Sequence, residues 1–148
     1  MKIIKVLFII SIFCSLVTVK SFCQDTLDNH RWHEQNEKHD RRYHSPYLVS
    51  NDRVFFNGRR VDGATASSFA ILKDGYAKDK WNVYYCGEKL KGATSNSFEA
   101  LGYGYAKDKW NVYFDGEKIK GASPNGFKVL HDGYAEDKWN TYYWGKKI

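Results

Sequence analysis

Three tryptophans at a fixed spacing are the residues of this sequence whose type best suits a binding function. Trp81, Trp110 and Trp139 lie 29 residues apart, and each follows an Asp-Lys pair and precedes an asparagine. Aromatic rings with a polar handle are common at binding surfaces, and a row of indoles suits stacking on the sugar rings of a glycan. The sequence favours a structural alternative, in which each indole covers the core of the next unit because repeats bury their faces against neighbours.

Catalysis and metal binding have weaker signals in this sequence. An enzyme needs several unlike groups with set roles, whereas Asp79, Asp108 and Asp137 recur because each unit folds in the same way. We therefore predict no catalytic residue, and an uncharacterised enzyme is the last of the functional alternatives. His30-x-x-His33 could place two imidazoles on one helical face, and transition metals favour imidazole. Because no spacing fixes a third ligand, we predict no specific metal site and no cofactor.

Residues 1–23 have the three regions of a secretory signal peptide. Lysines precede an uncharged apolar run from Val6 to Val19, and small residues occupy the two positions that a signal peptidase inspects. We expect cleavage after Cys23 and export to the periplasm or the medium. The alternative is a lipoprotein anchored at Cys23, but Lys20 and Phe22 stand where lipoprotein signals have an aliphatic and a small residue. The leader and this lipid are the only expected membrane attachments.

The charge of the chain argues against a nucleic-acid partner. The full sequence carries a formal net charge of +6, which falls to +3 when the three lysines of the leader are removed. The remaining lysines and arginines are spread among acidic residues, whereas a nucleic-acid footprint requires clustered basic residues. We therefore expect no nucleic-acid partner.

The segment from residue 24 to 49 is polar and charged, and it has no apolar periodicity around which it could fold. Four histidines lie among acidic residues in this segment. Such a composition is typical of a solvated, flexible linker.

The chain from residue 50 to 148 is predicted to contain four related units with a period of 29 residues, which is the signature of a repeat architecture. Each unit carries a β-hairpin, and Asn57-Gly58 and Asp115-Gly116 are strong signals for its two-residue turn. β-Branched and aromatic residues precede each turn, as strands prefer. The four predicted hairpins cover residues 50–61, 79–90, 108–119 and 137–148, approximately.

The second unit illustrates the expected faces of each hairpin. With a two-residue loop, Val83 and Tyr85 lie on the buried face, and Tyr84 pairs with Lys89 on an exposed face as a cation–π contact. Residues 75–78 are predicted to form a third strand, which makes the unit a three-stranded meander. The turn between this strand and the hairpin begins at an aspartate, whose side chain can accept backbone N–H bonds.

The connectors between hairpins are predicted to contain a short helix. Ser123-Pro124 is typical of a helix N-cap followed by proline at the first helical position. Phe98 and Leu101, three residues apart, would share one side of the helix that follows. Because one or two helical turns are not stable alone in water, this side must pack on a neighbouring meander and couple the repeats. The predicted fold is thus a mainly β, open repeat array, since 29 residues are fewer than the roughly 40 of a propeller blade.

The Asp-Lys-Trp-Asn-Val-Tyr-Tyr stretch beginning at Asp79, the turn glycine and the Gly-Ala-x-x-x-x-Phe-x-x-Leu connector resemble the DKNYY family of exported bacterial proteins. The resemblance covers residues 50–148, and tryptophan replaces the third-position asparagine of the family signature in all three copies. It implies the fold and the export, and it implies no activity. We expect a non-catalytic exported binding or scaffolding module of the cell envelope, with an envelope protein or a glycan as partner. Glycan binding through the repeated tryptophans is the named alternative.

Overall fold

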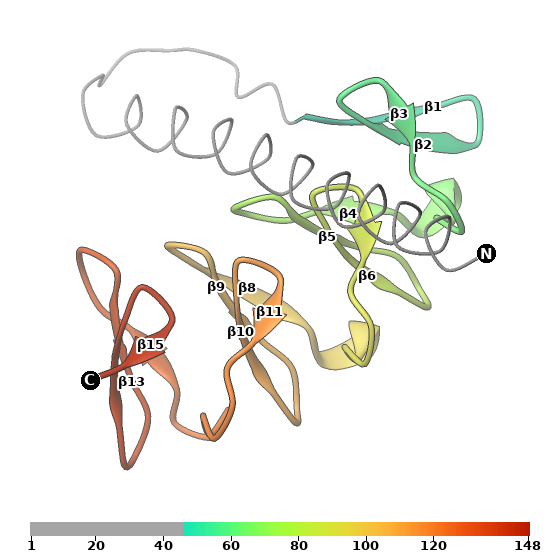
Figure 1. Ribbon diagram of the computed structural model, residues 1–148. Coiled ribbons are helices and arrows are strands. Elements are labelled where there is room, and N and C mark those ends of the chain that lie inside the picture. Colours follow the sequence, from blue (N-terminus) through green and yellow to red (C-terminus); the bar gives the residue numbers. More distant parts are fainter. Residues whose placement is uncertain (1–45) are drawn as a thin grey trace, which may run out of the picture. The chain divides into compact units, whose positions relative to one another are not determined.

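The computed structural model describes residues 46–148, which form four antiparallel sheets in chain order (Figure 1). The first sheet contains β1 (Tyr47–Ser50), β2 (Arg53–Phe56) and β3 (Arg59–Arg60). The second contains β4 (Ala70–Ile71), β5 (Tyr76–Lys78), β6 (Val83–Tyr85) and β7 (Glu88–Lys89). The third contains β8 (Glu99–Gly102), β9 (Tyr105–Lys107), β10 (Val112–Phe114) and β11 (Glu117–Lys118). The fourth contains β12 (Lys128–Val129), β13 (Tyr134–Glu136), β14 (Thr141–Tyr143) and β15 (Lys146–Lys147).

These sheets confirm the mainly β, tandem-repeat architecture that the 29-residue period predicts. The predicted signal peptide, the lipid alternative at Cys23, the histidines at 30 and 33, and nearly all of the predicted linker lie outside the described residues. Within residues 46–148, no helix has the length and apolar character that a membrane span requires.

The hairpin register of each repeat agrees with the prediction. Tyr84 pairs with Lys89 across β6 and β7, and β5 pairs with β6 as the predicted third strand of the meander. The two-residue turn between β6 and β7 has φ of +50° at Cys86 and +82° at Gly87, as a type I′ turn requires. The last three sheets also contain a fourth strand, β4, β8 or β12, which the sequence did not predict.

The prediction for the second face of each hairpin was wrong. Tyr84, Tyr113 and Tyr142 were expected to face solvent beneath a lysine, and all three are almost fully buried. Successive side chains of a strand point to opposite faces of its sheet, and the flanking residues Val83 and Tyr85 are buried too. In a repeat array, an internal sheet has a neighbour on each side, so both of its faces are covered.

The connectors are less helical than predicted. One turn of 3₁₀-helix is present at η1 (Ala66–Ser68) and η2 (Ser95–Ser97), and none is assigned in the third connector. Phe98 follows η2 directly, and Leu101 lies in strand β8. Thr65 and Thr94, which occupy the position of the predicted N-cap Ser123 in these two connectors, make no side-chain capping bond. The phenylalanine therefore packs from an extended segment that continues into the sheet.

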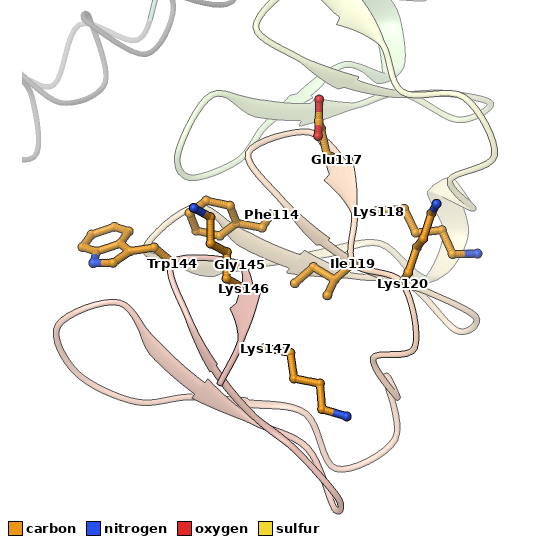
Figure 2. A pocket seen from close by; sticks show the side chains of 9 residues that line it. All are labelled: Phe114, Glu117, Lys118, Ile119, Lys120, Trp144, Gly145, Lys146 and Lys147. Carbon is orange, nitrogen blue, oxygen red and sulfur yellow. The ribbon is translucent and has the colours of Figure 1, made fainter.

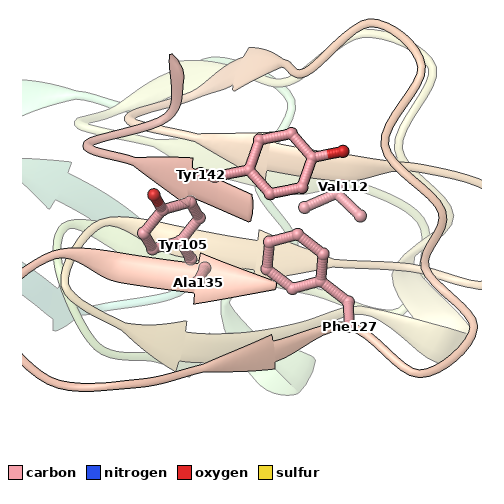
Figure 3. Packing of buried hydrophobic residues seen from close by; sticks show 5 residues of the cluster. All are labelled: Tyr105, Val112, Phe127, Ala135 and Tyr142. Carbon is pink, nitrogen blue, oxygen red and sulfur yellow. The ribbon is translucent and has the colours of Figure 1, made fainter. Parts of the chain in front are cut away.

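Aromatic side chains of the connectors fill the space between consecutive sheets, as predicted. The ring centroid of Phe127 lies 5.7 Å from that of Tyr105 in the preceding sheet and 5.6 Å from that of Tyr142 in its own sheet. Figure 3 shows this cluster with Val112 and Ala135, all five residues being buried. The same arrangement recurs in the triplets Tyr47–Phe69–Tyr84 and Tyr76–Phe98–Tyr113.

A tyrosine hydroxyl also joins each sheet to the next. The hydroxyl of Tyr76 donates to the carbonyl of Gly104, 3.1 Å away, and accepts from the N–H of Gly116 at 2.9 Å. Tyr47 and Tyr105 make the equivalent pairs of bonds with the glycines of their following repeats. Burial raises the pKa of the Tyr76 hydroxyl well above its usual value, so it stays protonated and can donate. This pair of hydrogen bonds, together with the aromatic packing, forms the interface between repeats.

Candidate functional site

The turn that begins at each repeated aspartate is held by the carboxylate. Oδ1 of Asp79 accepts the backbone N–H groups of Trp81 and Asn82, each at 2.7 Å. Oδ2 accepts the backbone N–H of Thr65 at 2.8 Å and the hydroxyl of Tyr84 at 3.0 Å. One carboxylate therefore fixes its own turn, the preceding connector and the buried tyrosine of the next strand. Asp108 and Asp137 bind the four corresponding donors of their repeats.

These bonds determine the ionisation of the aspartates and of their tyrosine partners. Burial alone would raise the pKa of Asp79, but the donated N–H and O–H bonds outweigh it and leave the pKa below its usual value. The pKa of Asp108 and that of Asp137 are lowered for the same reason. Burial and the adjacent carboxylate raise the pKa of Tyr84 to about 12. The aspartates are thus ionised structural acceptors, as the sequence predicted for a turn residue.

A dependence of stability on pH follows from the lowered pKa of these aspartates. A carboxylate with a lowered pKa in the folded state stabilises the fold above its unfolded pKa of about 4, and this stabilisation is lost as the pH falls. We expect the free energy of unfolding, measured in urea, to decrease steadily from pH 5 to pH 2. Asp137→Asn should reduce this slope, while the exposed Asp62→Asn should leave it unchanged. Equal slopes for the two variants would contradict the assignment.

The three tryptophans are exposed, so the structural interpretation that the sequence favoured was wrong. Trp81, Trp110 and Trp139 expose 68%, 66% and 76% of their surface. In each turn the aspartate carboxylate accepts the backbone N–H of the tryptophan, and a buried tyrosine of the next strand donates its hydroxyl to the same carboxylate. The indole is therefore not needed to cover the core, and it projects from the turn.

A lysine lies over each of these indole rings. The Nζ atom of Lys80 is 4.8 Å from the ring centroid of Trp81. Lys109 and Lys138 hold the same position over Trp110 and Trp139, at 5.0 and 4.7 Å. The sequence predicted cation–π contacts on the hairpin, at Tyr84 and its equivalents, whereas the structure has them at the preceding turn. Each repeat from the second to the fourth thus presents a flat apolar ring next to a positive charge.

The exposed indole and its lysine have a chemistry that suits ligand contact. An indole face can stack on the apolar face of a planar or cyclic ligand, and an ammonium group attracts an anionic substituent. The carboxylate of Asp79 already accepts four hydrogen bonds from the chain itself. Among residues 46–148, no group of three or more metal-ligating side chains comes together.

An open cavity of about 430 Å³ lies between the hairpins of the third and fourth repeats (Figure 2). Phe114, Ile119 and Trp144 supply its apolar lining, and Figure 2 shows Trp144 on the opposite side from Lys118. The polar side chains that line it are Glu117, Lys118, Lys120, Lys146 and Lys147. This cavity is suited to an anionic group attached to an apolar body.

Several functional features of the turns were not predicted from the sequence. The hydroxyl groups of Tyr84 and Tyr76 have defined partners, whereas the sequence indicated only a cation–π contact for Tyr84 and a strand position for Tyr76. A signal was available, since Tyr76 recurs every 29 residues although many other apolar residues could fill a strand position. The lysine over each indole precedes its tryptophan in all three copies, which was a second available signal.

Comparison with known proteins places the repeats in one family. The model of the DKNYY family matches the chain twice, over residues 47–103 and over residues 89–146. No curated protein and no solved structure matches the chain.

Proposed function

We propose that this chain, which belongs to the DKNYY family, is a non-catalytic exported module that binds glycans of the bacterial cell envelope. The observation that carries this proposal is the exposure of Trp81, Trp110 and Trp139 at equivalent positions of consecutive repeats. Tryptophan is enriched at interaction surfaces, where its indole supplies an apolar face and a polar N–H. Three such side chains at a regular spacing fit a ligand that is itself a repeating polymer.

The chemistry of each turn supports a glycan, in particular an anionic one. Sugar rings have apolar faces that stack on indoles, and Lys80, Lys109 and Lys138 place an ammonium group beside each indole. Several weak sites on one chain bind a polymer with a combined affinity far above that of one site. A scaffolding role through an envelope protein is the second candidate, because exposed tryptophans are also enriched at protein interfaces.

Tryptophan variants test this proposal. Because Trp110 is exposed, Trp110→Ala should change the free energy of unfolding by no more than about 0.5 kcal/mol. The triple variant in which Trp81, Trp110 and Trp139 are all alanine should bind at least about tenfold more weakly, since avidity is lost with the sites. Binding is measured by co-sedimentation with purified peptidoglycan and with insoluble polysaccharides.

The matched control is Leu48→Ala, which removes an exposed apolar side chain of β1 outside the tryptophan turns. It should sediment with the glycan as the parent protein does. If the parent protein sediments with none of these glycans, the glycan proposal is overturned. Binding that persists unchanged in the triple variant would instead assign it to another surface.

A further inference from the structure

The two ends of the repeat array expose the two halves of the interface that joins its internal repeats. Inside the array, the hydroxyl of one tyrosine forms hydrogen bonds with two glycines of the next repeat. A second aromatic residue from the same repeat as the tyrosine, on the first strand of the β-hairpin, packs against the glycine of the next hairpin turn. For the second and third repeats these groups are Tyr76, Tyr85 and the glycines 104 and 116. Within residues 46–148, the first repeat has no repeat before it and the fourth has none after it.

The fourth repeat exposes the donating half. Tyr134, the equivalent of Tyr76, is 37% exposed, and Tyr143, the equivalent of Tyr85, is 42% exposed. Their ring centroids are 4.6 Å apart, close to the 4.8 Å between Tyr76 and Tyr85. The two rings therefore already have the arrangement that they have in an internal repeat. Within residues 46–148, no group forms a hydrogen bond with the Tyr134 hydroxyl.

The first repeat exposes the accepting half. Gly58 is equivalent to Gly87 and has a similar φ, +76° against +82°. Nothing lies within 4 Å of the position of a Cβ at Gly58, whereas Phe56 of the preceding repeat covers Gly87. The carbonyl of Pro46 accepts the backbone N–H of Asn57 at 2.9 Å. In the next repeat, the carbonyl of Gly75 accepts the backbone N–H of Cys86 in the same way. The Gly75 carbonyl also accepts a second hydrogen bond, from the hydroxyl of Tyr47. Because a carbonyl oxygen has two lone pairs, the Pro46 carbonyl can likewise accept a second hydrogen bond from a tyrosine hydroxyl.

We propose that the fourth repeat of one copy docks on the first repeat of a second copy with the contacts of the internal interface. The Tyr134 hydroxyl would donate to the Pro46 carbonyl of the second copy and accept from its Gly58 N–H, and Tyr143 would cover Gly58. The occupant is a second copy of this chain because the two exposed halves continue an interface that the chain makes three times internally. Such a head-to-tail contact is heterologous, so it generates linear oligomers unless its rotation closes them into a ring.

The association is expected to be weak, because no connector phenylalanine is available to fill the space between two separate copies. In sedimentation velocity, the full-length protein should show dimers and longer species that grow with concentration up to about 500 µM, as small interfaces require. Tyr134→Ala removes the donating half of the contact. Gly58→Asn places a side chain where Tyr143 of the other copy would lie, and asparagine is chosen because it tolerates the positive φ of this turn. Each variant alone should remain monomeric over the same range.

An equimolar mixture of these two variants distinguishes head-to-tail docking from any other association. Gly58→Asn keeps its fourth repeat and Tyr134→Ala keeps its first, so the mixture should form dimers and nothing longer. Tyr143→Ala serves as a second donating-half variant if Tyr134→Ala unfolds. The proposal is overturned if the parent protein is monomeric throughout, which includes the case in which residues before Pro46 cover the first repeat. It is also overturned if both variants associate alone, or if their mixture stays monomeric.

The tryptophan turns are a separate surface, because they lie at the opposite end of each hairpin strand from the Gly58-type turns. The triple tryptophan variant should therefore associate as the parent protein does. Self-association and glycan binding can fail independently in these experiments.

Discussion

Asp108→Ala should lower the free energy of unfolding by about 3–5 kcal/mol, the range for loss of a buried hydrogen-bond network. The substitution leaves the N–H groups of Thr94, Trp110 and Asn111 and the hydroxyl of Tyr113 without their acceptor. Hydrogen bonds to a charged group contribute about 1.5–3 kcal/mol each, and partial hydration of the exposed turn reduces the sum. Urea denaturation at pH 7 measures the change.

Asp62→Ala provides the control for this variant. Asp62 is exposed, and lysines occupy the equivalent positions 91 and 120, so no repeat needs a carboxylate there. Its removal should change stability by no more than about 0.5 kcal/mol. A similar small change for Asp108→Ala would show that the turns are stable without their carboxylate.

Gly87→Ala should destabilise the protein by about 2–5 kcal/mol. A Cβ at this position would lie 2.8 Å from the Cβ and 3.1 Å from the Cγ of Phe56 in the preceding repeat. The Cβ of Phe56 is fixed by its own backbone, so the two repeats would have to separate. Overpacking of this kind typically costs 1–3 kcal/mol, to which a positive φ adds about 1–2 kcal/mol for a residue other than glycine.

Gly58→Ala separates these two contributions. The residue occupies the same turn position with a φ of +76°, and nothing lies within 4 Å of an added Cβ. It should therefore cost only the conformational part, about 1–2 kcal/mol. If both variants lose the same stability at low protein concentration, close packing between repeats is not what excludes a side chain at Gly87.

The sequence predicted well those features that depend on neighbours along the chain. A two-residue hairpin loop needs residues that adopt a positive φ, which identifies the turn at Asn57-Gly58. The length of such a loop then sets which residues pair across the hairpin, as Tyr84 does with Lys89. The role of Asp79 as a turn acceptor follows from the short reach of its side chain. Local chemistry was sufficient in each of these cases, and the period of 29 residues then extended it to every repeat.

Features that depend on contacts between repeats were predicted poorly. The hairpin pattern alone could not show that Tyr84 is covered by a connector phenylalanine, so its face was taken as exposed. The same omission made Trp110 a core candidate, since the buried tyrosines that already fill the space beneath the turn were placed on the surface. The candidate site therefore contains the three predicted tryptophans, but their indoles are exposed to solvent, whereas the sequence favoured buried indoles.

The hydroxyl of Tyr76 restricts how a chain of this design can change in length. Its two partners, Gly104 and Gly116, lie 28 and 40 residues further along the sequence, and the equivalent bonds of Tyr47 and Tyr105 have the same separations. Duplication or deletion of a complete 29-residue segment recreates both separations at the new junction. Any other insertion between the tyrosine and its glycines has to be looped out of the interface. Viable length variants of this chain should therefore differ by whole multiples of the repeat.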